Sequence, residues 1–247
     1  MRGAPHPAWI VPDWPAPGRV RSLVTTRAGG VSSGAFASLN LSARVGDDPA
    51  CVARNRAILC ACLPAEPAWI KQVHGTTVID PERATPETEA DGAVARRTGR
   101  VCVVMTADCL PVFLSDRAGL TVGVVHAGWR GLAGGVIENG VRAMGLPPEN
   151  LIAYIGPGIG ARRYEVGDEV RRAFVDKDPG AAGSFAPGRG EKYFADLSAL
   201  AKARLAAAGV TGVYGGGFCT ASDERFFSFR RDRTTGRMAS LIWLEDD

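Results

Sequence analysis

The middle of the chain carries two apolar runs that each lead directly into a cluster of polar, reactive side chains. Residues 101–105 lead into Thr106-Ala107-Asp108-Cys109, and residues 120–125 lead into His126-Ala127-Gly128-Trp129-Arg130-Gly131. Short continuous apolar runs of this length are typical of buried strands. A side chain at the end of such a strand is held rigidly, which suits a catalytic or binding group. We therefore expect the chemistry of this protein close to Cys109 and His126.

A third apolar run, residues 68–73, ends at His74. Two of the three histidines and one of the six cysteines therefore follow predicted strands. Strand ends of this kind can converge at one edge of a sheet, which would bring His74, Cys109 and His126 together.

Strand-type and helix-type patterns alternate along the rest of the chain. Asp48 followed by Pro49 is a typical helix start, and Asp196 precedes a helix rich in Ala and Leu. Residues 1–18, rich in proline, predict an irregular arm, and residues 177–190 predict a flexible loop. Further strands are expected at residues 20–26, 76–79, 91–95, 151–155, 210–214, 226–230 and 240–244, and helices from Pro49 onward and at residues 132–144, 168–175 and 197–208.

Neither an internal repeat nor a linker divides the 247 residues. The sequence therefore predicts a single α+β domain over residues 1–247, a layered structure with mixed β-sheets flanked by helices.

Composition excludes several classes of protein. No apolar run approaches the roughly 20 residues of a membrane span. The start of the chain lacks a signal-peptide pattern, so the six cysteines indicate reduced thiols and a cytoplasmic protein. The net charge is +3 and the arginine doublets are scattered, so neither nucleic acid nor membrane is an expected partner.

The residue types His74, Cys109 and His126 favour a metal site. Two imidazoles and a thiolate form a three-ligand set that leaves a fourth position for water or substrate, as in catalytic zinc sites. Copper also accepts such ligands. The alternative is a Cys109 nucleophile with His126 or His74 as its base and with Arg130 and Lys71 favouring the thiolate. Both uses need the same groups, so the sequence leaves them open, together with a buried polar His pair beside an inert Cys.

Two further residues near the cluster have both a chemical and a structural interpretation. Asp108 is either a general base or a residue that forms a turn. Arg130 lies at a predicted helix start, where it either binds phosphate or another anion or is an ordinary surface arginine. The stretch from Gly156 to Gly160 lacks the G-x-G-x-x-G pattern, which excludes a dinucleotide-binding loop.

Several motifs resemble the signature of the YfiH/laccase-domain family, whose bacterial members are described as purine nucleoside phosphorylases and formerly as polyphenol oxidases. Matching motifs occur in order over nearly the whole chain. They are Thr25-Thr26-Arg27-Ala28-Gly29-Gly30, Ser38-Leu39-Asn40-Leu41, Gln72-Val73-His74-Gly75, Thr106-Ala107-Asp108-Cys109, His126-Ala127-Gly128-Trp129-Arg130-Gly131, Ile155-Gly156-Pro157, Tyr164-Glu165-Val166-Gly167, and Phe226-Phe227-Ser228 through Arg231-Asp232 with Thr235-Gly236-Arg237.

The resemblance implies that His74, Cys109 and His126 bind a catalytic zinc, with copper in some relatives. It implies phosphorolysis of adenosine, inosine, guanosine and 5′-methylthioadenosine, and deamination of adenosine to inosine. The partners would then be a purine nucleoside and phosphate. The implied fold is the layered one shared with cytotoxic necrotising factor catalytic domains. Within the motifs, Arg27, Asn40, Gln72 and Arg231 are candidate substrate contacts.

Three other functions stay open at this point, as does the choice between monomer and homodimer. Some relatives are described as peptidoglycan editing factors, amidases that remove L-serine from a UDP-N-acetylmuramate precursor. A copper phenol oxidase is disfavoured, because multicopper clusters need more than three histidines. A redox-sensing or partner-binding module without enzymatic activity is the third.

Overall fold

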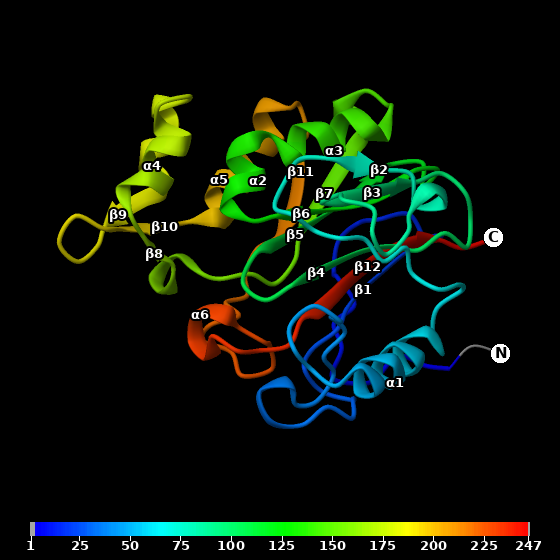
Figure 1. The fold of residues 1–247 in the computed structure, drawn as a ribbon. Coiled ribbons are helices and arrows are strands. Elements are labelled where there is room, and N and C mark those ends of the chain that lie inside the picture. Colours follow the sequence, from blue (N-terminus) through cyan, green and yellow to red (C-terminus); the bar gives the residue numbers. More distant parts are fainter. Residues whose placement is uncertain (1–2, 247) are drawn as a thin grey trace.

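A six-stranded sheet with the order β11-β7-β5-β6-β3-β2 forms the centre of the computed structural model, which describes residues 3–246 (Figure 1). The pairs β11–β7 and β2–β3 are parallel and the other neighbours are antiparallel, so the sheet is mixed. Its strands are β2 (Val78–Ile79), β3 (Gly92–Ala95), β5 (Leu110–Asp116), β6 (Val122–Ala127), β7 (Leu151–Ile155) and β11 (Gly212–Gly215).

A second, antiparallel sheet packs against one face of the first. It consists of β1 (Val20–Val24), β12 (Met238–Leu244) and β4 (Cys102–Thr106) in the order β1-β12-β4. Successive side chains of a strand point to opposite faces. In β6, Val122 and Val124 therefore enter the core between the two sheets, whereas Val125 and Ala127 face the helices on the other side. Both faces of β6 are buried, which explains its continuous apolar sequence.

Helices cover the two outer faces, so the molecule has a helix–sheet–sheet–helix order of layers (Figure 1). On one side α2 (Trp129–Gly134), α3 (Val136–Met144) and α5 (Leu197–Ala207) lie on the six-stranded sheet. On the other side α1 (Pro49–Cys60) packs Leu59 against the small sheet. These layers confirm the α+β fold with mixed sheets.

Two smaller units extend the layers near the end of β5. The first joins α4 (Asp168–Val175) to a three-stranded sheet of order β8-β10-β9, and it packs on α2 and α5 (Figure 1). The second is the short helix α6 (Phe229–Asp232). The three strands are β8 (Glu165–Val166), β9 (Phe185–Pro187) and β10 (Tyr193–Ala195).

Asp48 and Asp196 are the helix caps that the sequence predicts. Asp48 accepts a hydrogen bond from the Ala50 amide, and Asp196 accepts one from the Ala199 amide. Residues 3–18 contain no regular helix or strand, although Ile10 forms an isolated bridge with Val24.

Two predicted strands are wrong. Residues 68–73 are irregular apart from a bridge between Lys71 and Glu89, because the amides beyond Gln72 bind a side chain instead of a neighbouring strand. Residues 226–230 begin with two apolar residues because Phe226 and Phe227 are buried, but the chain then turns into α6. The Ser228 hydroxyl accepts a hydrogen bond from the Arg231 amide and so starts that helix.

Other differences concern breaks and short elements. The helix expected at residues 132–144 is two helices, α2 and α3, separated at Gly135, whose φ of 101° is in the left-handed region. Strand β5 is missing from the sequence prediction. Its second residue, Pro111, has no amide to donate to a neighbouring strand, but its carbonyl accepts a hydrogen bond from the Gly156 amide. The loop expected at residues 177–190 contains a 3-10 helix, Pro179–Ser184, and strand β9.

The six cysteines are all free thiols, as the sequence predicts. Among residues 3–246 we find no helix with the length and apolar character needed to cross a membrane.

The hairpin between β5 and β6 is closed by a buried carboxylate. Asp116 accepts hydrogen bonds from the amides of Ala118, Leu120 and Thr121, at 3.2, 2.7 and 2.7 Å. We expect Asp116→Ala to lower the free energy of unfolding by about 2 kcal/mol, because three turn amides lose their acceptor and the hydrogen bond from the Thr121 amide is buried. Urea denaturation measures this, and Asp13→Ala, at an exposed site, serves as the control. Equal stability of the two variants would contradict this account of the hairpin.

Candidate metal centre

His74, Cys109 and His126 meet at one point in the structure. The candidate ligand atoms of the three residues all lie within 4.8 Å of one another. The Cys109 Sγ is 3.9 Å from the His74 Nε2, and the two imidazole rings lie edge to face with centroids 4.8 Å apart. His126 is buried, Cys109 is half-buried and His74 is exposed. The cluster therefore has a rigid inner side and one side open to solvent.

Strand pairing brings Cys109 and His126 together. Leu110 pairs with Ala127 and Pro111 with His126 in the β5–β6 register, so Cys109, just before β5, lies beside the end of β6. The turn between β4 and β5 contains Asp108 with a φ of 96°. This conformation reverses the chain so that Cys109 faces β6.

A buried carboxylate, Asp91, holds the third ligand in place. Asp91 is fully buried immediately before β3, and it accepts hydrogen bonds from the amides of Val73, His74 and Gly75 at 3.2, 3.0 and 2.6 Å. The same carboxylate lies 2.8 Å from the Nδ1 of His126. Asp91 therefore ties the His74 segment to the imidazole of His126, and it leaves the Nε2 of His126 free to face Cys109.

Sequence reasoning did not single out Asp91 as a site residue. The available signal was an acidic residue directly before a wholly apolar strand, which needs a specific partner if it is buried.

Comparisons with known proteins agree with this arrangement of motifs. Residues 21–245 match the profile of the family described as "Multi-copper polyphenol oxidoreductase laccase". The chain belongs to this family, the YfiH/laccase-domain family. It is 51% identical to a purine nucleoside phosphorylase of Pseudomonas aeruginosa, covering 97% of this chain and 99% of the relative. It is 49% identical to the purine nucleoside phosphorylase YfiH of Escherichia coli, covering 95% of this chain and 98% of the relative.

Solved structures of the family have the same fold. A crystal structure of a Neisseria meningitidis protein matches with a TM-score of 0.93 and 50% identity, and covers 97% of this chain and 100% of that chain. The structure of YlmD from Geobacillus stearothermophilus matches with a TM-score of 0.84 and 30% identity, covering 93% of each chain.

The cluster is strongly coupled electrostatically. Burial opposes ionisation of the Cys109 thiol, but the charge of His126 and hydrogen bonds from His126 and His74 outweigh it and lower the pKa of Cys109 to about 6. Burial likewise opposes a charged His126, but the Cys109 thiolate and Asp91 raise its pKa to about 9. Near neutral pH the metal-free site therefore holds a thiolate beside an imidazolium.

The donor set fits a metal ion of the kind that the family resemblance implies. Two imidazole nitrogens and a thiolate are ligands of both zinc and copper, and a hydrogen-bonded second ligand shell such as Asp91 is typical of such sites. Gly128 leaves the space free: a Cβ there would lie 2.9 Å from both the Cys109 Sγ and the His74 Cδ2. His74, Cys109 and His126 can therefore hold one ion with an open position toward solvent.

The Asp108 side chain stabilises the turn that precedes Cys109. Its buried carboxylate accepts hydrogen bonds from the Thr220 hydroxyl at 2.7 Å and from the Arg230 amide at 2.6 Å. One oxygen thus joins the Cys109 turn to the loop that carries Thr220, and the other joins it to α6. Arg130, the second residue of α2, is exposed, and its guanidinium stacks on the Trp129 ring at 4.4 Å.

The four predicted substrate contacts mainly hold loops in place. Gln72 pairs both of its amide atoms with the backbone of Met105, at 2.9 and 2.7 Å, which fixes the His74 segment to β4. Asn40 is fully buried, and its amide binds Ser42, Asp47 and the Arg237 amide.

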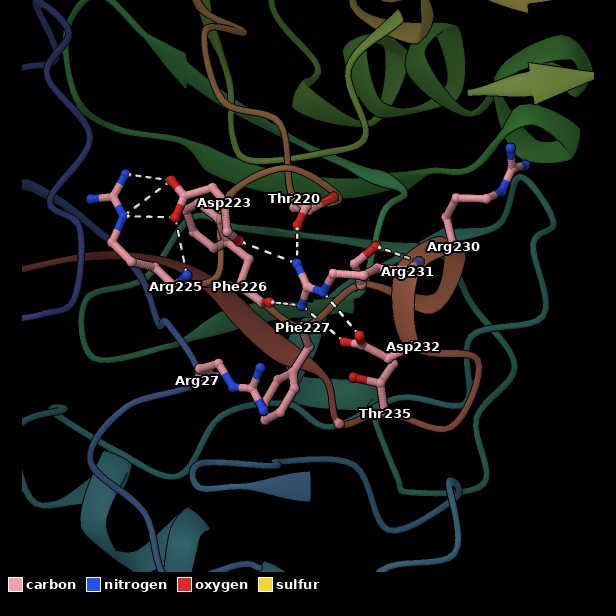
Figure 2. A network of polar contacts seen from close by, with 12 residues as sticks. Arg27, Thr220, Asp223, Arg225, Phe226, Phe227, Arg230, Arg231, Asp232 and Thr235 are labelled. Carbon is pink, nitrogen blue, oxygen red and sulfur yellow. Dashed lines mark hydrogen bonds and ion pairs between the residues drawn. The ribbon is translucent and has the colours of Figure 1, made fainter. Parts of the chain in front are cut away.

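The guanidinium groups of the two arginines in this group differ in their hydrogen bonds. The Arg231 guanidinium donates to the carbonyls of Thr220 and Phe226 and to Asp232, so it is enclosed by its own loop (Figure 2). Arg27 lies over the Phe227 ring at 5.1 Å (Figure 2). It donates a hydrogen bond to the Ala37 carbonyl.

We expect Asp91→Asn to weaken the affinity for added Zn²⁺ about 10- to 100-fold, because the amide no longer orients His126 as a carboxylate does. Competition with a chromophoric chelator measures the affinity. Glu89→Gln is the matched control, since Glu89 lies nearby but only forms an exposed ion pair with Lys71. Equal affinities of the two variants would show that Asp91 does not organise the site.

The thiolate of metal-free protein should disappear as the pH falls through about 6, the pKa of Cys109. The pKa is lowered, so the thiolate is present above this value and is protonated below it. Absorbance at 240 nm measures it, in a Cys219→Ser background because hydrogen bonds from Ser222 and Gly160 outweigh burial and lower the pKa of Cys219 as well. His126→Gln should move the midpoint upward, and an unchanged midpoint would contradict the coupling.

Proposed function

We propose that this protein is a zinc-dependent purine nucleoside phosphorylase that acts on adenosine, inosine, guanosine and 5′-methylthioadenosine, and that it also deaminates adenosine. The observation that carries the proposal is the convergence of His74, Cys109 and His126 with one side open to solvent. The proposal is supported by relatives about half identical over nearly the whole chain that are named purine nucleoside phosphorylases.

The chain's own residues have distinct tasks in this proposal. His74, Cys109 and His126 hold the ion, and a bound Zn²⁺ supplies Lewis acidity at the open position. Asp91 fixes the tautomer and orientation of His126. Arg130, exposed at the start of α2, attracts phosphate toward the open side. Asp108 keeps the Cys109 turn in place through its bonds to Thr220 and Arg230.

A second candidate is a cysteine-dependent amidase acting on a cell-wall precursor. The observation that favours it is the thiolate–imidazolium pair of Cys109 and His126, which is the activated state of a cysteine nucleophile. A multicopper oxidase has no such support. The chain has only three histidines, and one of them, His6, lies outside the cluster.

We expect zinc-loaded protein to convert inosine and phosphate into hypoxanthine and ribose 1-phosphate, and to convert adenosine partly into inosine. His126→Ala should lower kcat/KM at least about 100-fold, because the buried ligand and its link to Asp91 are lost together. His6→Ala is the matched control, since it removes the histidine outside the cluster. Product analysis by liquid chromatography measures both reactions.

Chelation separates the two candidates in the same preparation. Loss of nucleoside turnover with a chelator and its recovery with Zn²⁺ support the phosphorylase. Release of L-serine from UDP-N-acetylmuramoyl-L-serine that survives chelation and is lost in Cys109→Ser would instead support the amidase. Absence of nucleoside products above the His126→Ala background would refute the proposed function.

A further inference from the structure

A small pocket lies where the parallel strands β7 and β11 end. Its volume is about 230 Å³, and it is lined by the loop after β7, the first turns of α5 and the segment after β11. The loop contributes Gly156, Ile159 and Gly160, which belong to the glycine-rich stretch that does not match a dinucleotide-binding loop. Leu110 also lines the pocket, but none of the three candidate metal ligands does.

The path of the chain explains why a pocket forms at this edge of the sheet. Strand β7 leads through the unit of α4 to α5 and then to β11, which pairs with β7 in parallel (Figure 1). A helix that connects two parallel strands runs back along them, so the N-terminus of α5 lies beside the ends of β7 and β11. Ligands of α/β units bind at this edge, where loops and a helix N-terminus present backbone amides.

Ser198, the second residue of α5, brings an unpaired hydroxyl to the pocket. Its Oγ is buried and has no hydrogen-bond partner among residues 3–246. A buried hydroxyl without a partner destabilises a fold, so such a group indicates a contact with something outside the chain. The Ser198 amide belongs to the first turn of the helix, where amides have no partner within the helix.

The ammonium group of Lys202 faces the same space. Lys202 follows Ser198 by four residues, so both side chains lie on one face of α5. A Cβ added at Gly216 would clash with the Ser198 Oγ and would lie 3.7 Å from the Lys202 Nζ. The missing side chain of Gly216 therefore keeps the space between the two groups open. Lys202 forms no ion pair in the part of the chain that the structure describes.

The pocket also has an acceptor and an apolar wall. The Asp196 carboxylate lines it, and its Oδ1 accepts a hydrogen bond from the Ala199 amide, which leaves Oδ2 as an acceptor. Ile159 and Phe218 supply apolar surface. The pocket therefore matches a small molecule that has an anionic group at one end and hydroxyl groups beside it.

We propose that this pocket binds a phosphate monoester of a small sugar. The phosphate lies between the Ser198 hydroxyl and the Lys202 ammonium, and a sugar hydroxyl donates to Asp196. A phosphate group has enough oxygen atoms for the hydroxyl, the amide and the ammonium together, and helix N-termini favour such anions. The volume is below the roughly 300–1,000 Å³ of pockets for drug-sized ligands, which suits a small metabolite. This inference does not depend on the proposed function.

Isothermal titration calorimetry with ribose 5-phosphate tests the site on the zinc-loaded, full-length protein. We expect Lys202→Gln and Ser198→Ala each to weaken the affinity about five- to tenfold, because each loses a hydrogen bond to a charged group. Lys192→Gln is the control, since Lys192 is an exposed lysine that does not line the pocket. Without ligand, Ser198→Ala should not lower the melting temperature, because its hydroxyl has no partner to lose.

The metal centre is a competing location for the phosphate, and His126→Ala separates the two. Binding that persists in His126→Ala and weakens in both pocket variants supports the site, whether or not any nucleoside is converted. Loss of binding in His126→Ala, with full affinity in Lys202→Gln, would place the ligand at the metal centre and overturn the inference. Absence of binding in the unmodified protein would overturn it as well.

Inorganic phosphate and ribose are the comparison probes. Each should bind more weakly than ribose 5-phosphate, because each makes only part of the contacts, and equal affinity for inorganic phosphate would refute the sugar contact with Asp196. Ribose 1-phosphate, the sugar product of phosphorolysis, is the second ester. Tighter binding of this isomer would identify the ligand as that product, and tighter binding of ribose 5-phosphate would identify a sugar phosphate from another reaction.

Discussion

The buried Asp91 carboxylate is the interaction on which the geometry of the cluster depends. It accepts three amides from an irregular segment and contacts an imidazole on a central strand. Four donors around one anion lower the pKa of Asp91 despite the burial that raises it, so the carboxylate stays charged. A charged acceptor at this position holds His74 without a strand around it, which a neutral side chain would do less well.

The remaining constraint comes from strand pairing. His126 lies in β6 and Cys109 directly precedes the neighbouring, hydrogen-bonded strand β5, so their separation is set by the β5–β6 register. Gly128 completes this part of the site because its missing side chain leaves room for the Cys109 sulfur and the His74 ring. One side of the cluster is thus as rigid as the core, and the other side depends on a single anchored loop.

The sequence predicts the parts of this structure that follow from local chemistry. Asp48 and Asp196 are recognised as helix caps from their neighbours alone, and the apolar run of β6 predicts both the strand and its reactive end. The segment before His74 looks like a strand, but tertiary hydrogen bonds to Asp91 determine its path. No local pattern contains that information.

The same distinction applies to the site. Residue types indicate His74, Cys109 and His126, because few residues can ligate a metal. The motif residues Asn40, Gln72 and Arg231 are polar, and in the fold their polar groups bind backbone or loop atoms. Sequence alone does not distinguish a polar side chain that contacts substrate from one that fixes a loop, because both occur in the same motifs. Arg237 lies beside the start of the turn that carries Cys109 only because β12 pairs with β4.

The uneven exposure of the three ligands has a consequence for how the centre exchanges its ion. His126 is buried and Cys109 is half-buried, whereas His74 is exposed on an irregular segment. An ion held by these three residues would therefore arrive and depart past His74. A ligand bound at the open position would cover the same route, so the ion would exchange more slowly from an occupied site than from an empty one.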